Sequence, residues 1–455
     1  MKLSRFNSFI PYKGNVIAFN SLTQQFLVLK PMLHDLLMAS AREEGVDKLI
    51  DYHPTYYNAL SQKGFIVSDN KNENEEIKKL RDEIDLDETT YRLIINPTMN
   101  CNFKCWYCYE SHIKDSKMTD ETVEKVKCHI EKVFHEQKEL KSFHLSWFGG
   151  EPLLYYKKVI VPISDFARNL FSDSDIEFDM SFTTNGYLVN DELIQHLKKF
   201  DGTFLQITLD GSKDQHNKIR YVSKNKGSYE EIRDNIILLA QNQIRASVRV
   251  NYTGETLETI DGILDDFQDL DRNVKAFINF SFHNVWQDGK PDVDKVEEII
   301  TSFRRAGFAT SSQFSNVNSF RQSCYADKKN QATINFNGEV HKCTARDFTT
   351  DRAEGILHDD GSIAWNEKYY QRMDSKFKNS PCMSCRIQPI CNGGCSQQAM
   401  EQSHHDYCVW EDQGVSKDEI VLSKFKQMVE MKVLREESAA AKAAEKEAQK
   451  ETVTA

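Results

Sequence analysis

The sequence predicts an α/β protein built on a parallel sheet, and three observations support that expectation. Apolar strand candidates alternate with helix candidates between residues 91 and 282. Ten of the eleven cysteines fall into two spaced sets, one inside this region and one after it. At 455 residues the chain is about three times a typical domain length, so we expect two or three domains.

The core strands are expected at 91–96, 143–148, 178–182, 204–209, 246–252 and 276–282, with helices at 120–136, 191–200, 229–241 and 257–267. Strands this apolar, alternating with helices, are typical of a parallel sheet covered on its faces. Ligands of parallel α/β folds bind at the carboxyl ends of the strands. The loops that follow each strand are therefore the first place to look for a functional site.

The first 70 residues predict a small separate module. Apolar runs at 15–20 and 25–29 flank a turn and indicate a hairpin. A helix is expected to begin near Pro31, and a closing strand is expected at 65–67. Hairpin, helices and returning strand resemble a winged-helix module. Residues 71–90 are rich in Asn, Glu, Lys and Asp, which favours a solvated linker or an exposed helix.

Composition and charge exclude several classes of protein. Aromatic residues make up 11% of the chain, which is enough for large cores and excludes wholesale disorder. The 58 basic and 69 acidic residues are interleaved, so no nucleic-acid partner is expected. No apolar run reaches 18 residues and no secretory signal is recognised, so we expect no membrane partner and a cytoplasmic location.

The first cysteine set is Cys101-x3-Cys105-x2-Cys108, in the loop directly after the first core strand. Clustered thiols in a long chain of this composition are more often metal ligands than disulfide partners. A closed zinc site needs four ligands, and a cubane iron-sulfur cluster has four irons. Three thiolates therefore leave one metal position open, unless a distant fourth ligand closes a zinc site.

This spacing, with Tyr107 before the last thiol, resembles the cluster motif of the radical S-adenosylmethionine superfamily. The resemblance continues at the ends of the next three strands and covers about residues 91–408. The matching motifs are Gly149-Gly150-Glu151-Pro152, Thr183-Thr184-Asn185-Gly186 and Thr208-Leu209-Asp210-Gly211. It implies that residues 91–290 form a partial (β/α)6 TIM-like barrel, the radical core of that superfamily.

The resemblance also implies cofactors and residue roles. Cys101, Cys105 and Cys108 would hold a 4Fe-4S cluster whose fourth iron binds S-adenosylmethionine, and would be the catalytic residues. Reductive cleavage would give a 5′-deoxyadenosyl radical that removes a hydrogen atom from an unactivated substrate carbon. The expected contacts to S-adenosylmethionine are Gly149, Gly150, Glu151, Asn185, Thr208 and, twelve positions after Thr208, Arg220.

The second cysteine set resembles the seven-cysteine SPASM extension of peptide-modifying radical enzymes, within residues 291–415. The resemblance implies two auxiliary 4Fe-4S clusters. Cys382, Cys385, Cys391 and Cys408 would close one, whereas Cys324, Cys343 and Cys395 would hold the other with three thiolates and leave its fourth ligand undetermined. Zinc is the alternative for this region, but seven thiolates do not divide into four-coordinate sites.

Two further segments complete the chain. Cys128 lies among charged residues on its expected helix, so an incidental surface thiol is expected there. Residues 416–455 predict a helical tail with an apolar stripe at its start. Beyond Glu436 the tail becomes an Ala, Glu and Lys repeat with nothing apolar to bury, which favours a frayed helix or disorder.

The resemblance leaves the substrate open between two groups. Peptide maturases of this kind form thioether or carbon-carbon cross-links on ribosomally made peptides, and their N-terminal modules bind the precursor peptide. Anaerobic sulfatase-maturating enzymes instead make formylglycine from Cys or Ser, and carry an aspartate base where this chain has Thr344, with Asp347 nearest. We therefore expect a peptide maturase, served by an electron donor such as flavodoxin or ferredoxin. A non-enzymatic zinc-binding module is the third hypothesis.

Overall fold

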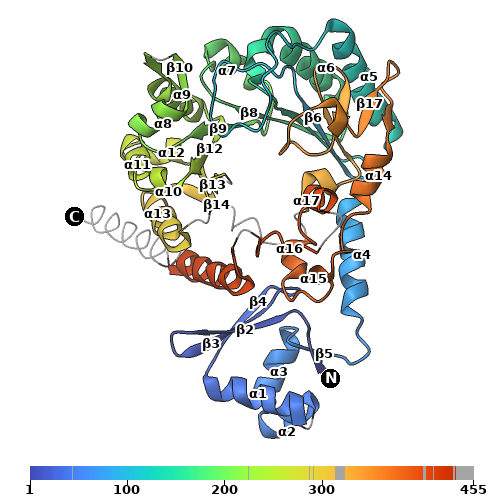
Figure 1. Ribbon diagram of the computed structural model, residues 1–455, viewed down its shortest axis with the longest axis vertical. Helices are drawn as coiled ribbons and strands as arrows, with labels where there is room; N and C mark the ends of the chain where they lie inside the picture. The colour runs from blue at the N-terminus through green and yellow to red at the C-terminus, as the bar shows by residue number, and fades with distance from the viewer. Residues whose placement is uncertain are drawn as a thin grey trace, which may run out of the picture.

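The structure is a computed structural model that describes residues 1–455 except 44, 224, 286, 290–291, 313–322, 403–405, 413, 434–435 and 437–455. Its largest element is an eleven-stranded sheet with the order β14-β13-β12-β9-β8-β7-β6-β15-β16-β17-β18. Helices cover the outer face of this sheet, and a small N-terminal module lies below it in Figure 1.

Eight neighbouring strands of the sheet, from β14 to β15, are parallel, which confirms the α/β fold class. In the described part of the chain the sheet does not close on itself, as expected for a partial barrel. The parallel strands are β6 (Thr90–Ile95), β7 (Ser142–Trp147), β8 (Glu177–Thr184), β9 (Phe204–Leu209), β12 (Arg245–Tyr252), β13 (Ile278–Asn284), β14 (Ala309–Ser312) and β15 (Gln331–Ile334). The sequence predicts the first six, and the structure adds β14 and β15 at the two ends.

The helices of this region follow the strands along the chain. They are α5 (Asp120–Glu136), η2 (Pro152–Tyr155), η3 (Tyr156–Ile160), α6 (Val161–Phe171), α7 (Asp191–Leu197), α8 (Lys213–Ile219), α9 (Tyr229–Gln241), α10 (Gly254–Leu257), α11 (Asp261–Phe267), α12 (Arg272–Lys275) and α13 (Val293–Arg305). A two-stranded ribbon, β10 (Tyr221–Ser223) and β11 (Lys226–Gly227), lies between α8 and α9. The expected helices at 120–136 and 229–241 are confirmed at both ends.

One expected helix is wrong in its extent. The segment 257–267 is not continuous, because α10 ends at Leu257 and α11 begins at Asp261. The Thr253 hydroxyl caps α10, and the Thr256 hydroxyl accepts a hydrogen bond from the Thr253 N–H at 2.8 Å, so α10 begins before the predicted start. Short polar side chains that bond to nearby backbone compete with a continuous helix.

Alternation along the strands gives the sheet an apolar outer face and a polar inner face. On β12, for example, Val248, Val250 and Tyr252 are buried in the main apolar core, whereas Arg249 and Asn251 line the cavity described below. Successive residues of a strand point to opposite faces, so one strand can serve packing and ligand binding together.

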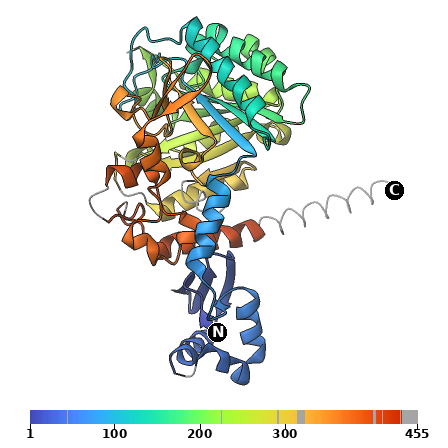
Figure 2. The same cartoon turned by 90° about the vertical axis from the view of Figure 1, so that its right-hand side faces the viewer.

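The N-terminal module holds a three-stranded antiparallel sheet with the order β2-β3-β4 and a cluster of short helices. Its elements are β1 (Lys2–Leu3), β2 (Asn7–Tyr12), β3 (Asn15–Asn20), β4 (Gln25–Leu29), α1 (Pro31–Glu43), η1 (Val46–Lys48), α2 (Leu49–Tyr52), α3 (Pro54–Gln62) and β5 (Ile66–Val67). The expected hairpin and closing strand are present, but β5 pairs with β1. Figure 2 shows the module projecting from the body of the molecule.

The segment 71–90 forms helix α4 (Glu73–Asp85), the second of the two structures expected there. It is not wholly solvated, because Ile77 is buried with Phe6 and Phe377. An apolar stripe on one face of an otherwise charged helix is sufficient for such packing. Helix α4 thereby connects the N-terminal module to the C-terminal cysteine region, as Figure 1 shows.

The C-terminal region consists of short elements around the second cysteine set. They are η4 (Tyr325–Asp327), β16 (Glu339–His341), η5 (Thr350–Arg352), β17 (Gly355–Leu357), β18 (Ile363–Trp365), α14 (Glu367–Met373), α15 (Ser380–Met383), α16 (Gln388–Cys391) and α17 (Ser396–Glu401). Residues 417–433 are helical, and the Phe425 ring lies 5.5 Å from that of Phe26 in the N-terminal module. The expected Ala, Glu and Lys tail lies almost wholly outside the described residues.

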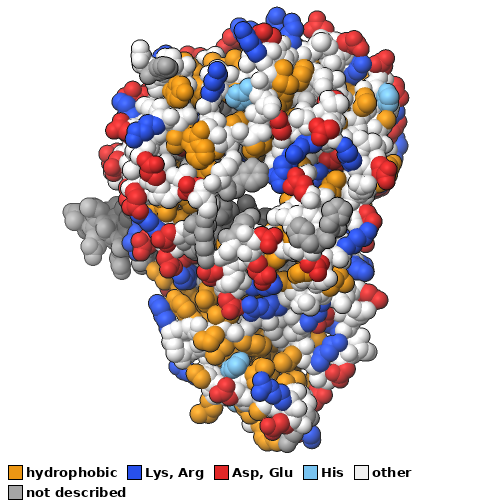
Figure 3. All heavy atoms as spheres, viewed as in Figure 1, with side chains coloured by type: hydrophobic (Ala, Val, Ile, Leu, Met, Phe, Trp, Pro, Cys, Tyr) orange, Lys and Arg blue, Asp and Glu red, His pale blue; other side chains and the backbone are white. Residues whose placement is uncertain are grey.

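The surface bears both signs of charge throughout the face shown in Figure 3, where acidic and basic side chains alternate. Within the described residues, no helix combines the length and the apolar character that crossing a membrane requires.

Candidate active site and thiol groups

A cavity of about 200 Å³ opens at the carboxyl ends of the parallel strands. Cys101, Cys105 and Cys108 enter it from the loop between β6 and α5. The opposite wall comes from the ends of β8, β9, β12 and β13. The polar residues of that wall are Thr183, Thr184, Asn185, Gln206, Thr208, Arg249, Asn251 and Asn284.

The loop that bears the three thiols is closed by its own hydrogen bonds. The Met118 N–H donates to the Pro97 carbonyl at 2.8 Å, and the Ile113 N–H donates to the Met99 carbonyl at 3.0 Å. Phe103, between the first two thiols, is fully buried in the main apolar core. The loop is therefore fixed at both ends and anchored in its middle, so its thiols have defined positions.

The surroundings of the three thiols favour a role as metal ligands over a role as free nucleophiles. Burial raises the pKa of the Cys101 thiol to about 12 and that of Cys108 to about 11, so neither ionises readily without a cation. In the described part of the chain, no three His, Cys, Asp or Glu side chains are placed to hold a single metal ion. Thiolates are the ligands of iron-sulfur clusters, and this donor set at the cavity wall fits a polynuclear group.

The glycine pair after β7 lies directly against the thiol-bearing loop. A Cβ at Gly149 would meet the Asn96 Cβ at 2.7 Å, and a Cβ at Gly150 would collide with the Asn100 carbonyl oxygen. Both residues have positive φ, which side chains rarely tolerate. The Asn96 side chain thus leaves no room for a side chain at Gly149, and the backbone of the thiol loop leaves none at Gly150. Gly150 also lines the cavity, whereas Gly149 does not.

Glu151 is fully buried behind the cavity wall and does not line the cavity. Its carboxylate accepts hydrogen bonds from the Thr184 hydroxyl at 2.7 Å and from the Asn185 N–H at 2.8 Å. Burial raises its pKa to about 6. The Asn185 side chain donates to Asn102 Oδ1 at 2.7 Å, so Glu151 positions the end of β8 relative to the thiol loop.

Thr208 and Arg220 both line the cavity, as expected from the sequence. The Arg220 Nε donates to Asp210 Oδ2 at 2.7 Å, and its Nη2 donates to the Tyr107 hydroxyl at 2.6 Å. Tyr107 in turn donates to Asp210. A cation, an anion and a phenol thus form one buried unit that connects the thiol loop to β9 and α8.

Several polar residues of the cavity are not predicted from the sequence. Glu110 accepts a hydrogen bond from the Gly150 N–H at 2.7 Å, and burial raises its pKa to about 7. Arg249 enters the cavity from β12. Strand periodicity could have identified Arg249, because it occupies an inward position among buried valines. No sequence signal separates Glu110 from other loop carboxylates.

Four C-terminal thiols surround one small cavity of about 20 Å³, and they are the four that the motif groups together: Cys382, Cys385, Cys391 and Cys408. The Trp410 Nε1 donates to the Cys391 sulfur at 3.3 Å. Asn379 connects the two arms of this group, since it accepts from the Tyr407 N–H at 3.1 Å and lies 3.6 Å from the Cys382 sulfur. A fourfold thiol set is a complete donor set for a cubane cluster.

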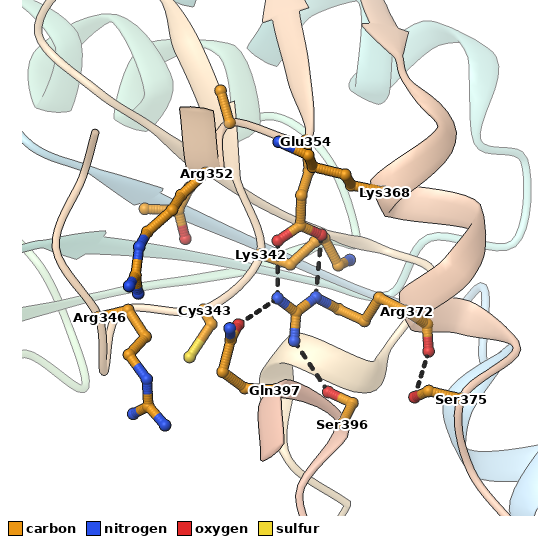
Figure 4. Close-up of polar contacts among 12 residues, drawn as sticks. Lys342, Cys343, Arg346, Arg352, Glu354, Lys368, Arg372, Ser375, Ser396 and Gln397 are labelled. Carbon is orange, nitrogen blue, oxygen red and sulfur yellow. Dashed lines mark hydrogen bonds and ion pairs between the residues drawn. The ribbon is translucent and has the colours of Figure 1, made fainter. Parts of the chain in front are cut away.

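The remaining three thiols, Cys324, Cys343 and Cys395, form another group. Burial, Asp327 and the two neighbouring thiols together raise the pKa of Cys324 to about 12. Beside Cys343, Arg372 forms two hydrogen bonds of 2.9 and 2.8 Å to Glu354 and one of 3.0 Å to the Ser396 hydroxyl, as Figure 4 shows. Arg372 thereby joins the segment before β17 to the start of α17, next to Cys395.

The first thiol loop and the C-terminal region are in direct contact. The Tyr109 hydroxyl donates to the Thr344 carbonyl at 2.7 Å, and the Ser111 N–H donates to Asp347 at 2.8 Å. Neither Thr344 nor Asp347 lines the large cavity. Cys128, the one cysteine outside these three groups, is half-buried on α5 and lines neither cavity.

Curated proteins similar to this chain include a radical SAM enzyme and sulfatase-maturating enzymes. The radical SAM cyclopropyl synthase TigE of Paramaledivibacter caminithermalis is 22% identical over 74% of this chain and 75% of its own length. A cysteine-type anaerobic sulfatase-maturating enzyme of Clostridium novyi is 26% identical over 41% of this chain and half of its own length. The chain likewise spans about half the length of an uncharacterized Synechocystis protein that is 30% identical to it.

Two solved structures share the fold. The enzyme anSMEcpe with bound AdoMet and a peptide has a TM-score of 0.58 at 17% identity, covering 75% of this chain and 98% of that one. Streptococcus suis SuiB bound to S-adenosylmethionine has a TM-score of 0.51 at 16% identity, covering 90% and 99%. Residues 95–267 match the model of the Radical SAM superfamily. Because this match spans the thiol loop and the ends of the first strands, the chain carries a radical SAM domain.

Proposed function

We propose that this protein is a radical S-adenosylmethionine enzyme that cross-links a ribosomally made peptide through a thioether or carbon-carbon bond. The observation that carries the proposal is the convergence of three thiols, short polar strand-end residues and Arg220 on one cavity. We assign residues 91–290 to the radical core and residues 291–415 to an auxiliary-cluster domain. The similarity to TigE and to the fold of SuiB supports this assignment.

Cys101, Cys105 and Cys108 would hold a 4Fe-4S cluster, and Gly150, Asn185, Thr208 and Arg220 are available around S-adenosylmethionine in the same cavity. When bound and reduced, this pair of cofactors supplies a 5′-deoxyadenosyl radical that removes a hydrogen atom from an unactivated carbon. An electron donor such as flavodoxin or ferredoxin is required for the reduction. The protein's own contribution is placement and exclusion of water.

Glu151, Asp210 and Tyr107 have a positioning role in this proposal. Glu151 fixes Asn185 through a backbone hydrogen bond, and Asp210 and Tyr107 hold the Arg220 guanidinium. Each connects the thiol loop to the end of a neighbouring strand. Radical chemistry requires the hydrogen donor and acceptor to be close and oriented, so a rigid wall serves the reaction directly.

The two C-terminal thiol groups would hold the auxiliary 4Fe-4S clusters, one with four thiolates and one with three. The cluster of Cys324, Cys343 and Cys395 would then have one iron available to another ligand, such as a peptide thiolate. The contacts of Tyr109 with Thr344 and of Ser111 with Asp347 connect this group to the active cavity.

The N-terminal module is our candidate for precursor-peptide recognition. Within the described residues, β4 is hydrogen-bonded to a neighbouring strand on one side only. Val28 on β4 is 57% exposed and Met32 at the start of α1 is 80% exposed. An unpaired edge beside exposed apolar side chains suits an extended peptide that adds a strand.

Co-expression with a small peptide encoded beside this gene, followed by mass spectrometry, tests the proposal. We expect a loss of two hydrogens for each cross-link, which C105A abolishes. The double variant V28D/M32D should weaken peptide binding while cleavage of S-adenosylmethionine continues, because both side chains are exposed. If that variant binds the peptide as tightly as the wild type, the module is not the recognition element.

Formylglycine formation is the second candidate, because a sulfatase-maturating enzyme is among the relatives. Its expected base is absent from the position of Thr344, and Asp347 is engaged by Ser111. A sulfatase peptide with a central Cys would acquire an aldehyde if this candidate were right. A fully reconstituted enzyme that cleaves S-adenosylmethionine but forms no aldehyde excludes it.

A further inference from the structure

Two arginines line the cavity, and they differ in whether a carboxylate neutralises the guanidinium charge. Arg220 forms an ion pair with Asp210 at 2.7 Å. Arg249 lines the same cavity from β12, yet among the described residues no carboxylate lies within ion-pair distance of it. Its printed hydrogen bond runs from Nε to Asn251 Oδ1, a neutral acceptor, at 2.8 Å.

Among the described residues, the groups around Arg249 act on its charge through space and form no ion pair with it. Burial lowers the pKa of His283 to about 3, so this neighbour is neutral at pH 7 and its Nε2 is occupied by the Ser281 hydroxyl at 2.9 Å. The Tyr107 hydroxyl donates to Asp210 and accepts from Arg220, and the Tyr109 hydroxyl donates to the Thr344 carbonyl at 2.7 Å. Asp210 acts on Arg249 as well, but its carboxylate is bonded to Arg220.

Partial burial removes water from the guanidinium, and this loss of hydration costs free energy when no anion is paired with it. An anion that binds there compensates for part of that cost. The planar fork of nitrogens matches a carboxylate in particular, because two parallel hydrogen bonds can form. With Nε held by Asn251, the terminal nitrogens of Arg249 are the ones available in the cavity.

We propose that Arg249, oriented by Asn251, binds a carboxylate in the cavity. This inference rests on the proposed function and deepens it. The carboxylate has two possible sources, the methionyl carboxylate of S-adenosylmethionine and an acidic residue of the peptide substrate. Both are the same chemistry for Arg249, and an experiment with two arms separates them.

The first arm measures S-adenosylmethionine binding by anaerobic equilibrium dialysis of the full-length, cluster-loaded protein. A charge-assisted hydrogen bond predicts that R249Q weakens this affinity about 10- to 100-fold and that R249K restores part of it. Decarboxylated S-adenosylmethionine, which lacks the carboxylate, should bind R249Q and wild type equally. R245Q is the matched control, since Arg245 begins the same strand but is exposed.

The second arm measures binding of the capped pentapeptides Gly-Gly-Glu-Gly-Gly and Gly-Gly-Gln-Gly-Gly with S-adenosylmethionine present. If the peptide supplies the carboxylate, wild type prefers the Glu peptide, and R249Q loses that preference while its S-adenosylmethionine affinity stays unchanged. The inference is overturned if neither arm shows a carboxylate preference that depends on Arg249. Failure of wild type to bind S-adenosylmethionine would instead overturn the proposed function itself.

Discussion

The two thiol-bearing regions of this molecule use the same residue type but are stabilised in different ways. The first loop lies on the main apolar core, where Phe103 is buried together with Trp147 and the other large side chains of the parallel sheet. The C-terminal groups lie among short helices beside small apolar clusters. There, buried ion pairs such as Arg372 with Glu354 and Lys376 with Asp327 join the segments.

A thiol site can therefore be formed by the fold alone, or it can depend on the bound metal for its structure. The first loop has a core beneath it and closes through its own hydrogen bonds, so we expect it to keep its conformation when the metal is removed. The C-terminal region has little apolar area of its own. Metal binding is folding free energy in such regions, so the clusters there have a structural role as well.

The largest effect is expected from C105A. This change removes one thiolate of the first set, so cleavage of S-adenosylmethionine should be abolished while the iron content falls from about twelve to about eight. Iron analysis and chromatographic detection of 5′-deoxyadenosine measure the two quantities. C128A is the control, because Cys128 lines neither cavity, and it should keep both.

Removal of the metal tests whether the two thiol-bearing regions depend on it to different degrees. In protein stripped of iron, we expect amide hydrogens of α15, α16 and α17 to exchange rapidly, whereas β6 to β9 stay protected by the apolar core. Hydrogen exchange with mass spectrometry of loaded and stripped protein gives the result. Equal protection of the C-terminal helices in both forms would contradict the contrast between the two regions.

R372M tests the ion pairs of the C-terminal region. Arg372 and Glu354 have side chains that are 2% and 4% exposed, so the change leaves a buried carboxylate without its partner. The free energy of unfolding should fall by about 3–5 kcal/mol. R372K keeps the positive charge but loses the planar guanidinium that makes two parallel hydrogen bonds. Its free energy of unfolding, measured by chemical denaturation, should lie between those of wild type and R372M. An R372M protein as stable as wild type would show that this ion pair does not stabilise the region.

A pH dependence is expected where α5 contacts the loop before β18. His129 is buried between the Tyr91 hydroxyl and the Gly361 carbonyl, and burial lowers its pKa to about 4 from the usual 6.5. The unfolded chain therefore binds the proton more readily, so stability falls as pH drops from about 6.5 to 4, by about 3 kcal/mol at most. H129N should flatten this part of the stability profile, and an unchanged slope would contradict the assignment.

The sequence predicts the core sheet and the cysteine groups well, because their signals are local. Apolar strands and thiols at fixed spacing need no tertiary information, and the extents of α5 and α9 follow from their apolar periodicity. The strands β14 and β15 were not predicted as part of the sheet, since they are short and only their pairing partners distinguish them from loops. The split between α10 and α11 depends on hydrogen bonds of threonine side chains.

Four of the expected contacts to S-adenosylmethionine line the cavity, whereas Gly149 and Glu151 do not, and the hydrogen bonds that hold the cavity wall were not predicted. Thr208 and Arg220 could be recognised by motif, whereas the ion pair of Arg220 with Asp210 and the burial of Glu151 are properties of the folded chain. Arg249 appears in the sequence as one charged residue within an apolar strand. The role proposed for Arg249 depends on how close the nearest carboxylates lie in the folded chain. The spacing of residues along the sequence does not reveal those distances.

The most direct test uses anaerobically reconstituted protein mixed with S-adenosylmethionine and a strong reductant such as dithionite. We predict that 5′-deoxyadenosine and methionine form in the wild type and in C128A. A protein that assembles its iron-sulfur clusters fully but leaves S-adenosylmethionine intact would contradict the assignment of Cys101, Cys105 and Cys108 as the reactive site.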